Sequence, residues 1–168
     1  MRTTKMASLY QQHAARWKDC RECSLCKGRR RVVLARGQVP CDVLFCGEAP
    51  GASEDVIGSP FVGPAGKLLD SIIDQAGWNG GAAMPPVKWA VTNLVCCIPR
   101  SEDEGKLAEP PEESILACRP RLVEFVALAD PQLIICVGSL ARDWLDPKRH
   151  RNRVEWEQGE IPMIDIVH

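Results

Sequence analysis

Residues 43–66, VLFCGEAPGASEDVIGSPFVGPAG, contain the clearest structural signals of the chain. Its first four residues are a continuous apolar run, which predicts a short buried strand that ends at Gly47. The next twenty residues, 47–66, contain five glycines and three prolines, and this composition predicts a long irregular loop. Loops of this length inside a compact domain usually carry function, so the sequence places chemistry directly after this strand.

Helical and strand patterns alternate on both sides of this stretch. Leu68, Leu69, Ile72 and Ile73 share one face of a predicted helix that Gly77 would end. Helices are predicted over 4–18, 67–76, 111–129 and 139–145. Strands are predicted over 43–46, 89–97, 133–137 and 161–167.

These alternating elements favour one fold class. The predicted strands are continuous apolar runs separated by helices, which is typical of a sheet buried on both faces. We therefore expect a three-layer α/β/α sandwich with a central, mainly parallel four-stranded sheet, forming a single domain over residues 1–168. Ligands of such folds bind outside the carboxyl ends of the strands. Gly47, Glu48, Asn93, Gly138 and His168 stand at those ends.

Composition limits the function classes. Apolar residues make up 45% of the chain and charged residues 26%, which is the balance of a soluble globular protein. The net charge of −1 gives no overall attraction to nucleic acid, so any such contact must come from local basic patches. The first twenty residues are polar, and no apolar run is long enough for a membrane span. A cytoplasmic location, with no membrane partner, is the expectation.

The chain has nine cysteines, many for its length. In a reducing compartment such a set indicates metal binding sooner than disulfides, and the odd number excludes complete pairing within one chain. Their spacing alone does not separate zinc from an iron–sulfur cluster. Their positions are 20, 23, 26, 41, 46, 96, 97, 118 and 136.

Four segments together resemble one family. Residues 47–70, GEAPGASEDVIGSPFVGPAGKLLD, resemble the first motif of the family 4 (iron–sulfur) uracil-DNA glycosylases. Residues 92–99, TNLVCCIP, residues 117–141, and residues 164–168, IDIVH, resemble later segments of that family in the expected order. The resemblance covers nearly all of residues 18–168. It implies a DNA repair enzyme that hydrolyses the N-glycosidic bond of uracil and leaves an abasic site.

The resemblance implies roles for the uracil-binding residues. Such an enzyme flips the base out of the DNA and holds it by its face and edges. Phe61 would stack on the base, and the Asn93 amide would bind the pyrimidine edge by donating and accepting hydrogen bonds. His168 would donate to uracil O2 as negative charge builds there. Gly47 and Gly51 would let the backbone approach the base closely.

Two carboxylates are the acidic candidates. Glu48, and in second place Glu54, could orient water or stabilise a cationic sugar. An alternative for Glu54 is that it only begins a short helical turn. Ala49 stands where other glycosylases carry a water-activating Asp, and family 4 is similar in lacking that Asp. We include Ala49 among the substrate-binding positions.

The resemblance also implies a cofactor. Cys20, Cys23, Cys97 and Cys118 match the ligands of the family's [4Fe–4S] cluster, whose role we expect to be structural. Cys26 and Cys96 lie close enough in sequence to compete as ligands. The basic residues next to the first cysteines are expected to contact DNA phosphates. They are Arg29, Arg30 and Arg31.

Three hypotheses follow. The first is the glycosylase, expected as a monomer acting on uracil-containing DNA. The family continues beyond the position of His168 with a wedge loop and a closing helix, so we expect this chain to be cut short and to act on single strands more easily than on duplex. The second is a catalytically impaired DNA-binding or replication-associated module that keeps the cluster and the uracil pocket. The third is a zinc-stabilised domain unrelated to DNA.

Overall fold

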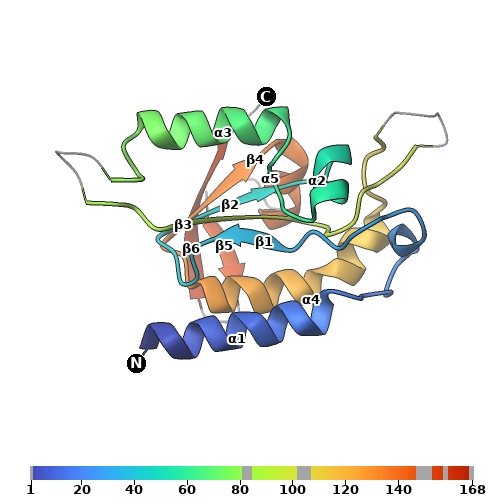
Figure 1. The fold of residues 1–168 in the computed structure, drawn as a ribbon, viewed down its shortest axis with the longest axis horizontal. Coiled ribbons are helices and arrows are strands. Elements are labelled where there is room, and N and C mark those ends of the chain that lie inside the picture. The colour runs from blue at the N-terminus through green and yellow to red at the C-terminus, as the bar shows by residue number, and fades with distance from the viewer. Residues whose placement is uncertain (1, 81–84, 102–106, 147–152, 157–158, 167–168) are drawn as a thin grey trace.

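The computed structural model describes residues 2–80, 85–101, 107–146, 153–156 and 159–166. A sheet forms its centre, with α3 on one face and with α1 and α4 side by side on the other (Figure 1). This is the three-layer α/β/α arrangement that the sequence predicts. Within the described residues, no helix is long and apolar enough to cross a membrane.

The sheet has six strands in the order β1-β3-β2-β4-β6-β5. The neighbours β3–β2, β2–β4 and β4–β6 are parallel, whereas the outer strands β1 and β5 each pair antiparallel. The strand bounds are Ala35–Gly37 (β1), Val43–Gly47 (β2), Trp89–Asn93 (β3), Leu133–Val137 (β4), Arg153–Trp156 (β5) and Gly159–Ile166 (β6).

Five α-helices and one 3-10 turn are present in the described residues. Pro64 occupies the first turn of α3, where its missing N–H costs nothing. Glu112 and Glu113 occupy the first turn of α4, where their charge suits the helix dipole. The helix bounds are Arg2–Trp17 (α1), Ala52–Ile57 (α2), Pro64–Gln75 (α3), Glu112–Ala129 (α4) and Ser139–Leu145 (α5), and the turn η1 spans Ser24–Lys27.

The sheet differs from the prediction in its strand number. The four predicted strands are the four parallel ones, β2, β3, β4 and β6, so the centre of the sheet is as expected. The prediction of four strands in total is wrong, because β1 and β5 add one strand to each edge. Both are short, and their sequences ARG and RVEW lack the apolar run that a buried strand shows.

The stretch 47–66 is also more regular than expected. It contains the six-residue helix α2 and the first turn of α3. Gly51 precedes α2, and Gly58 ends it in the left-handed conformation with φ 83°. The glycines that predicted a wholly irregular loop therefore bound a helix, and only Gly58 needs the conformational freedom of glycine.

Apolar side chains pack on both faces of the sheet. Leu44, Ile134 and Met163 face α4 and α5 in one buried cluster. Phe45 and Val91 face α3 in the other, where they meet Leu69 and Ile73. Because successive strand residues point to opposite faces, the end of β3 presents one residue to each layer.

Candidate active site and thiol cavity

Three predicted residues meet where β2 and β3 end. Gly47 and Asn93 are register partners across this parallel pair. A Cβ atom at Gly47 would lie 2.5 Å from the Asn93 Oδ1 and 2.6 Å from the Phe61 Cζ. The aromatic ring and the amide therefore converge over bare backbone, and only glycine leaves room for both.

An open cleft lies at this point. Its volume is about 390 Å³. Ala49 and Gly51, both predicted to bind substrate, belong to its wall together with Phe61 and Asn93. A cleft lined by an aromatic ring and an amide suits a heterocycle that stacks on one face and bonds at one edge.

The position of the Phe61 ring depends on an unusual backbone conformation. Phe61 has a φ of 55°, which is uncommon for a residue with a side chain. Arg36 on β1 stabilises this conformation by donating to the carbonyls of Pro60, at 2.9 Å, and Phe61, at 3.0 Å. The same guanidinium pairs with Asp70 of α3 at 2.7 Å. This contact of Arg36 with the loop of Phe61 was not predicted from the sequence.

Glu54 supports the same loop from inside. Its carboxylate accepts hydrogen bonds from the backbone N–H groups of Gly51 at 3.1 Å, Val62 at 2.9 Å and Gly63 at 2.7 Å. The residue is buried. Both carboxylate oxygens are therefore engaged by the loop on either side of the cleft. Glu54 also belongs to the cleft wall, and it stands in the first turn of the short helix α2, as the alternative expects. Its catalytic role stays a prediction.

Glu48 stands apart from the cleft wall. It is half-buried, and it is not among the residues that line the described part of the cleft. Burial, and in second place the negative charge of Glu109, raises the pKa of Glu48 above its ordinary value. Its carboxylate has no hydrogen-bond partner among the described residues. Glu48 therefore remains free to bind a proton, a water molecule or a cation.

The Asn93 side chain is buried and unengaged. Only 2% of its surface is exposed, and no hydrogen bond to its amide is found within the described residues. The amide lines the cleft, so it is available to a partner from outside the chain. The adjacent backbone is fixed, because Leu94 N donates to Gly47 O at 2.9 Å. His168, the remaining predicted contact with the base, lies outside the described residues.

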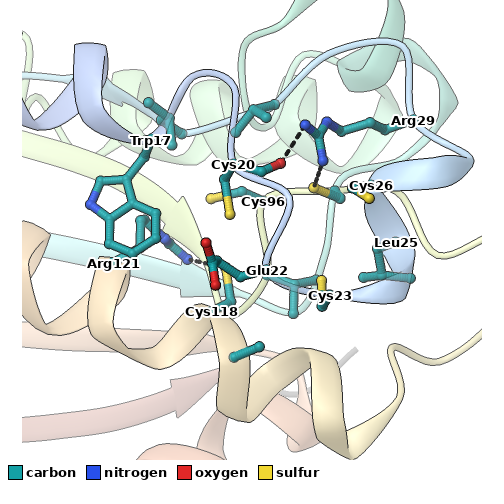
Figure 2. A pocket seen from close by; sticks show the side chains of 15 residues that line it. Trp17, Cys20, Glu22, Cys23, Leu25, Cys26, Arg29, Cys96, Cys118 and Arg121 are labelled. Carbon is teal, nitrogen blue, oxygen red and sulfur yellow. Dashed lines mark hydrogen bonds between the residues drawn. The ribbon is translucent and has the colours of Figure 1, made fainter.

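A second cavity lies on the α4 side of the sheet and gathers six thiols (Figure 2). The thiols come from the segment after α1, from the end of the β3 segment and from α4, so three distant parts of the chain meet there. All nine cysteines are free. We call this the thiol cavity; its cysteines are Cys20, Cys23, Cys26, Cys96, Cys97 and Cys118.

Two arginines approach the thiol cavity. The Arg29 guanidinium donates to the Cys20 carbonyl at 2.5 Å and to the Cys97 sulfur at 3.4 Å. Arg121 lies 3.8 Å from the Cys118 sulfur. A hydrogen bond with the Cys96 thiol lowers the pKa of Cys118 to about 5, and the charge of Arg121 adds to this effect against burial. The cavity therefore favours thiolate at Cys118.

The thiols are spread around the cavity. Among the described residues, no three Cys, His, Asp or Glu side chains are grouped closely enough to hold one metal ion. A single zinc ion would draw its thiolates to about 2.3 Å each, whereas an iron–sulfur cluster offers a separate iron to each thiolate. Free thiols from three segments, with cations beside them, fit a group larger than one ion.

The three arginines predicted to contact DNA do not behave alike. The Arg29 guanidinium contacts the thiol cavity, and its contact with DNA phosphates stays a prediction. Arg30 and Arg31 are exposed, and their backbone N–H groups donate to the buried Asp55 carboxylate at 2.8 Å and 3.3 Å. Asp55 also pairs with Arg100 at 2.8 Å. α2 therefore fixes the loop that presents Arg30 and Arg31.

Comparison with known proteins agrees with this geometry. Residues 35–168 match the profile of the Uracil DNA glycosylase superfamily, and the chain belongs to that superfamily. Its relatives include a protein of Saccharolobus solfataricus named type-4 uracil-DNA glycosylase, 37% identical over 78% of this chain and 56% of the relative. Proteins with the same name from Pyrobaculum aerophilum and Thermotoga maritima are 36% and 29% identical, over 74% and 86% of this chain and 58% and 73% of their own lengths. The chain thus spans little more than half of the first two relatives.

Proposed function

We propose that this chain removes uracil from DNA by hydrolysing the bond between uracil N1 and the sugar C1′. The observation that carries the proposal is the convergence of the Phe61 ring and the unengaged Asn93 amide over Gly47. Membership of the superfamily and the type-4 name of the relatives support it. In the reaction a water oxygen bonds to C1′, the N-glycosidic bond breaks, and uracil leaves with the electron pair. The water loses one proton, and the uracil anion takes up one.

The proposed roles follow from position in the cleft for the described residues, and from the family resemblance for His168. Phe61 stacks on the flipped base, and Asn93 reads its edge with one donor and one acceptor. Gly47, Ala49 and Gly51 form the backbone surface against which the base lies. His168 donates to uracil O2, where negative charge builds in the transition state.

Glu48 is our candidate for the side of the sugar. Its unengaged carboxylate could stabilise positive charge on the sugar or orient the attacking water. Glu54 is a positioning residue in this proposal, because its oxygens hold the backbone beside Phe61 and Gly51. Neither role requires an Asp at the position of Ala49.

We propose that the thiol cavity holds a [4Fe–4S] cluster. The type-4 relatives imply an iron–sulfur cluster in general, and the free thiols of the cavity are suitable ligands. Cys20, Cys23, Cys97 and Cys118 would hold it, leaving Cys26 and Cys96 as neighbours. When bound, the cluster would supply structural cross-linking between the three segments, not a step of the hydrolysis.

Further expectations concern the setting. We propose that the protein acts as a single-domain monomer, in the cytoplasm, on single strands more readily than on duplex. Arg30 and Arg31 are the proposed phosphate contacts, because they are exposed beside the thiol cavity. Nine free thiols suit a reducing compartment.

The test is uracil release from single-stranded and duplex oligonucleotides by anaerobically purified protein. Asn93→Ala removes the reading amide and is expected to lower the rate at least about a hundredfold, because the edge of the base loses its bonding partner. Asn79→Ala is the matched control, since Asn79 is an exposed amide bonded to Asp74 and Trp89.

Either outcome is informative. Release that persists in Asn79→Ala and disappears in Asn93→Ala supports the glycosylase. A folded, brown protein that binds DNA but releases no uracil from either substrate would contradict it.

A further inference from the structure

Arg121 is a buried cation at the centre of the molecule. It lies on α4, one helical turn after Cys118, and only 1% of its surface is exposed. Its Nη1 donates to the Thr92 hydroxyl at 2.8 Å. Its Nη2 donates to the carbonyls of Asn93 at 2.6 Å and Leu94 at 3.0 Å. The guanidinium thus forms hydrogen bonds with three consecutive residues at the end of β3.

No carboxylate within the described residues pairs with Arg121. Burying an uncompensated guanidinium is costly, and its Nε has no hydrogen-bond partner there either. The nearest source of negative charge is the thiol cavity, whose wall includes Arg121 itself together with Cys96 and Cys118 (Figure 2). Thiolates that bind a metal are negatively charged, so a loaded cavity would supply the missing counter-charge.

The strand that Arg121 grips separates the thiol cavity from the cleft. The Thr92 side chain faces Arg121 on the α4 side, whereas the Asn93 amide faces Phe61 on the other side. Beyond β3, the N–H groups of Leu94 and Val95 donate to the carbonyls of Gly47 at 2.9 Å and Glu48 at 3.2 Å. The carbonyls that Arg121 holds and the amides that fix Gly47 and Glu48 therefore belong to one short piece of backbone.

We propose that Arg121 is a positioning residue that couples the thiol cavity to the base-reading cleft. Negative charge on the cluster thiolates holds the guanidinium in place, and the guanidinium fixes the backbone of Asn93 and Leu94. The inference rests on the proposed function for the meaning of Asn93 and of the cluster. Its physical content is that loss of either the cluster or Arg121 loosens the same backbone segment.

The first experiment measures hydrogen–deuterium exchange of the Leu94 and Val95 amides by mass spectrometry, without DNA. Arg121→Met keeps most of the side-chain volume and removes the fork of donors. Exchange of the peptide with Leu94 and Val95 is expected to rise at least about tenfold, the effect of losing hydrogen bonds to a charged group. Arg119→Met is the matched control, because Arg119 is exposed two residues earlier on α4.

Iron removal completes this experiment. Chelating the iron under reducing conditions is expected to raise the same exchange in the parent protein, and to add little in Arg121→Met. Parental exchange in an Arg121→Met protein of full iron content would overturn the proposal. So would equal, additive effects of chelation in both proteins.

A second variant serves if Arg121→Met does not fold. Arg121→Lys keeps the charge but replaces the planar fork by a single ammonium. It is expected to keep the reduction potential of the cluster while exchanging faster at Leu94 and Val95. A folded Arg121→Met protein is expected to show a lower potential, since a nearby cation favours the reduced cluster. If Leu94 and Val95 exchange in Arg121→Lys at the same rate as in the parent protein, charge compensation would be the sole role of Arg121. That result would refute the positioning role.

The rate of uracil release separates the two proposals. In an active parent, Arg121→Lys is expected to lower kcat at least about tenfold with little change in KM, because Arg121 does not touch DNA. An inactive parent would refute the proposed function. The exchange and potential measurements would still decide whether Arg121 couples the two sides of β3.

Discussion

At the scale of the residue, the cleft depends on Gly47, which has no side chain. Gly47→Ala would place a methyl group between the Phe61 ring and the Asn93 amide, closer to both than atoms can approach. One of the two must move, and a shift of about 1 Å at a reactive site can cost about a hundredfold in rate. We therefore expect Gly47→Ala to lower the rate of uracil release about a hundredfold while the chain stays folded.

Gly28→Ala is the matched control for this prediction. A Cβ atom at Gly28 would lie 3.6 Å from the Arg100 Cδ, which is an ordinary contact. Rates are measured under single-turnover conditions, with circular dichroism to check the fold. A Gly47→Ala protein as active as Gly28→Ala would mean that the base does not lie over Gly47.

Glu48 leads to a prediction about pH. If its ionised carboxylate serves the reaction, the rate falls as the pH drops through the pKa of Glu48, which burial and Glu109 hold above the ordinary value. Glu109→Gln removes one negative charge and so lowers that pKa. The acidic limb of the pH–rate profile is then expected to move to lower pH. Glu112→Gln, an exposed change in the same region, is expected to leave the limb in place, and an unmoved limb in Glu109→Gln would exclude Glu48 as the titrating group.

At the scale of the element, α2 acts as a brace. Its two acidic residues are both buried, and each binds backbone from a different loop. Asp55→Ala would leave the N–H groups of Arg30 and Arg31 without their acceptor. We expect the free energy of unfolding to fall by about 2–4 kcal/mol, with little of this from the half-exposed Arg100 pair.

Urea denaturation checks this value. Asp74→Ala removes an exposed carboxylate from α3, bonded to Asn79, and is expected to cost well under about 1 kcal/mol. Equal losses in the two variants would mean that Asp55 contributes no more than a surface residue.

The elements also show what the sequence could predict. The parallel strands β2, β3, β4 and β6 were predicted because each is buried on both faces and therefore apolar throughout. β1 and β5 were missed because an edge strand needs no apolar run. α2 was considered only as a short helical turn at Glu54, because its residues are polar and its bounding glycines are typical of loops.

The candidate site was predicted in part for a similar reason. Phe61, Asn93 and the cysteines belong to local motifs, so their sequence neighbours revealed them through the family resemblance. Arg36 and Arg121 act on residues more than twenty positions away, and no local pattern encodes such a contact. One signal was available: Arg121 interrupts the buried face of α4 formed by Leu122 and Phe125.

At the scale of the whole molecule, the thiol cavity joins the segment after α1 to the sheet and to α4. Cys118→Ser is expected to lower bound iron from about four atoms per chain to near zero, because a four-iron cluster needs each of its thiolates. Cys136→Ala, in the buried core of β4, is expected to keep the iron. Iron analysis and absorption near ~400 nm measure both.

Cys26 and Cys96, which the sequence left as possible competing ligands, are tested in the same way. Cys26→Ser and Cys96→Ala are expected to keep their iron if Cys20, Cys23, Cys97 and Cys118 are the ligands. Iron loss in either variant would replace one member of the proposed set.

The three-residue strand β1 has a consequence for the whole molecule. It pairs with β3 from the side opposite β2, matching Ala35 to Thr92 and Gly37 to Ala90. A slip of β3 by one residue would turn each side chain to the other face of the sheet, so the hydroxyl of Thr92 would enter the cleft and the amide of Asn93 would face the thiols. β3 is hydrogen-bonded to the antiparallel strand β1 on one side and to the parallel strand β2 on the other. A slip of β3 would therefore break both sets of hydrogen bonds at once. The short strand β1 thereby helps to keep the Thr92 side chain on the side of the thiol cavity and the Asn93 side chain on the side of the cleft.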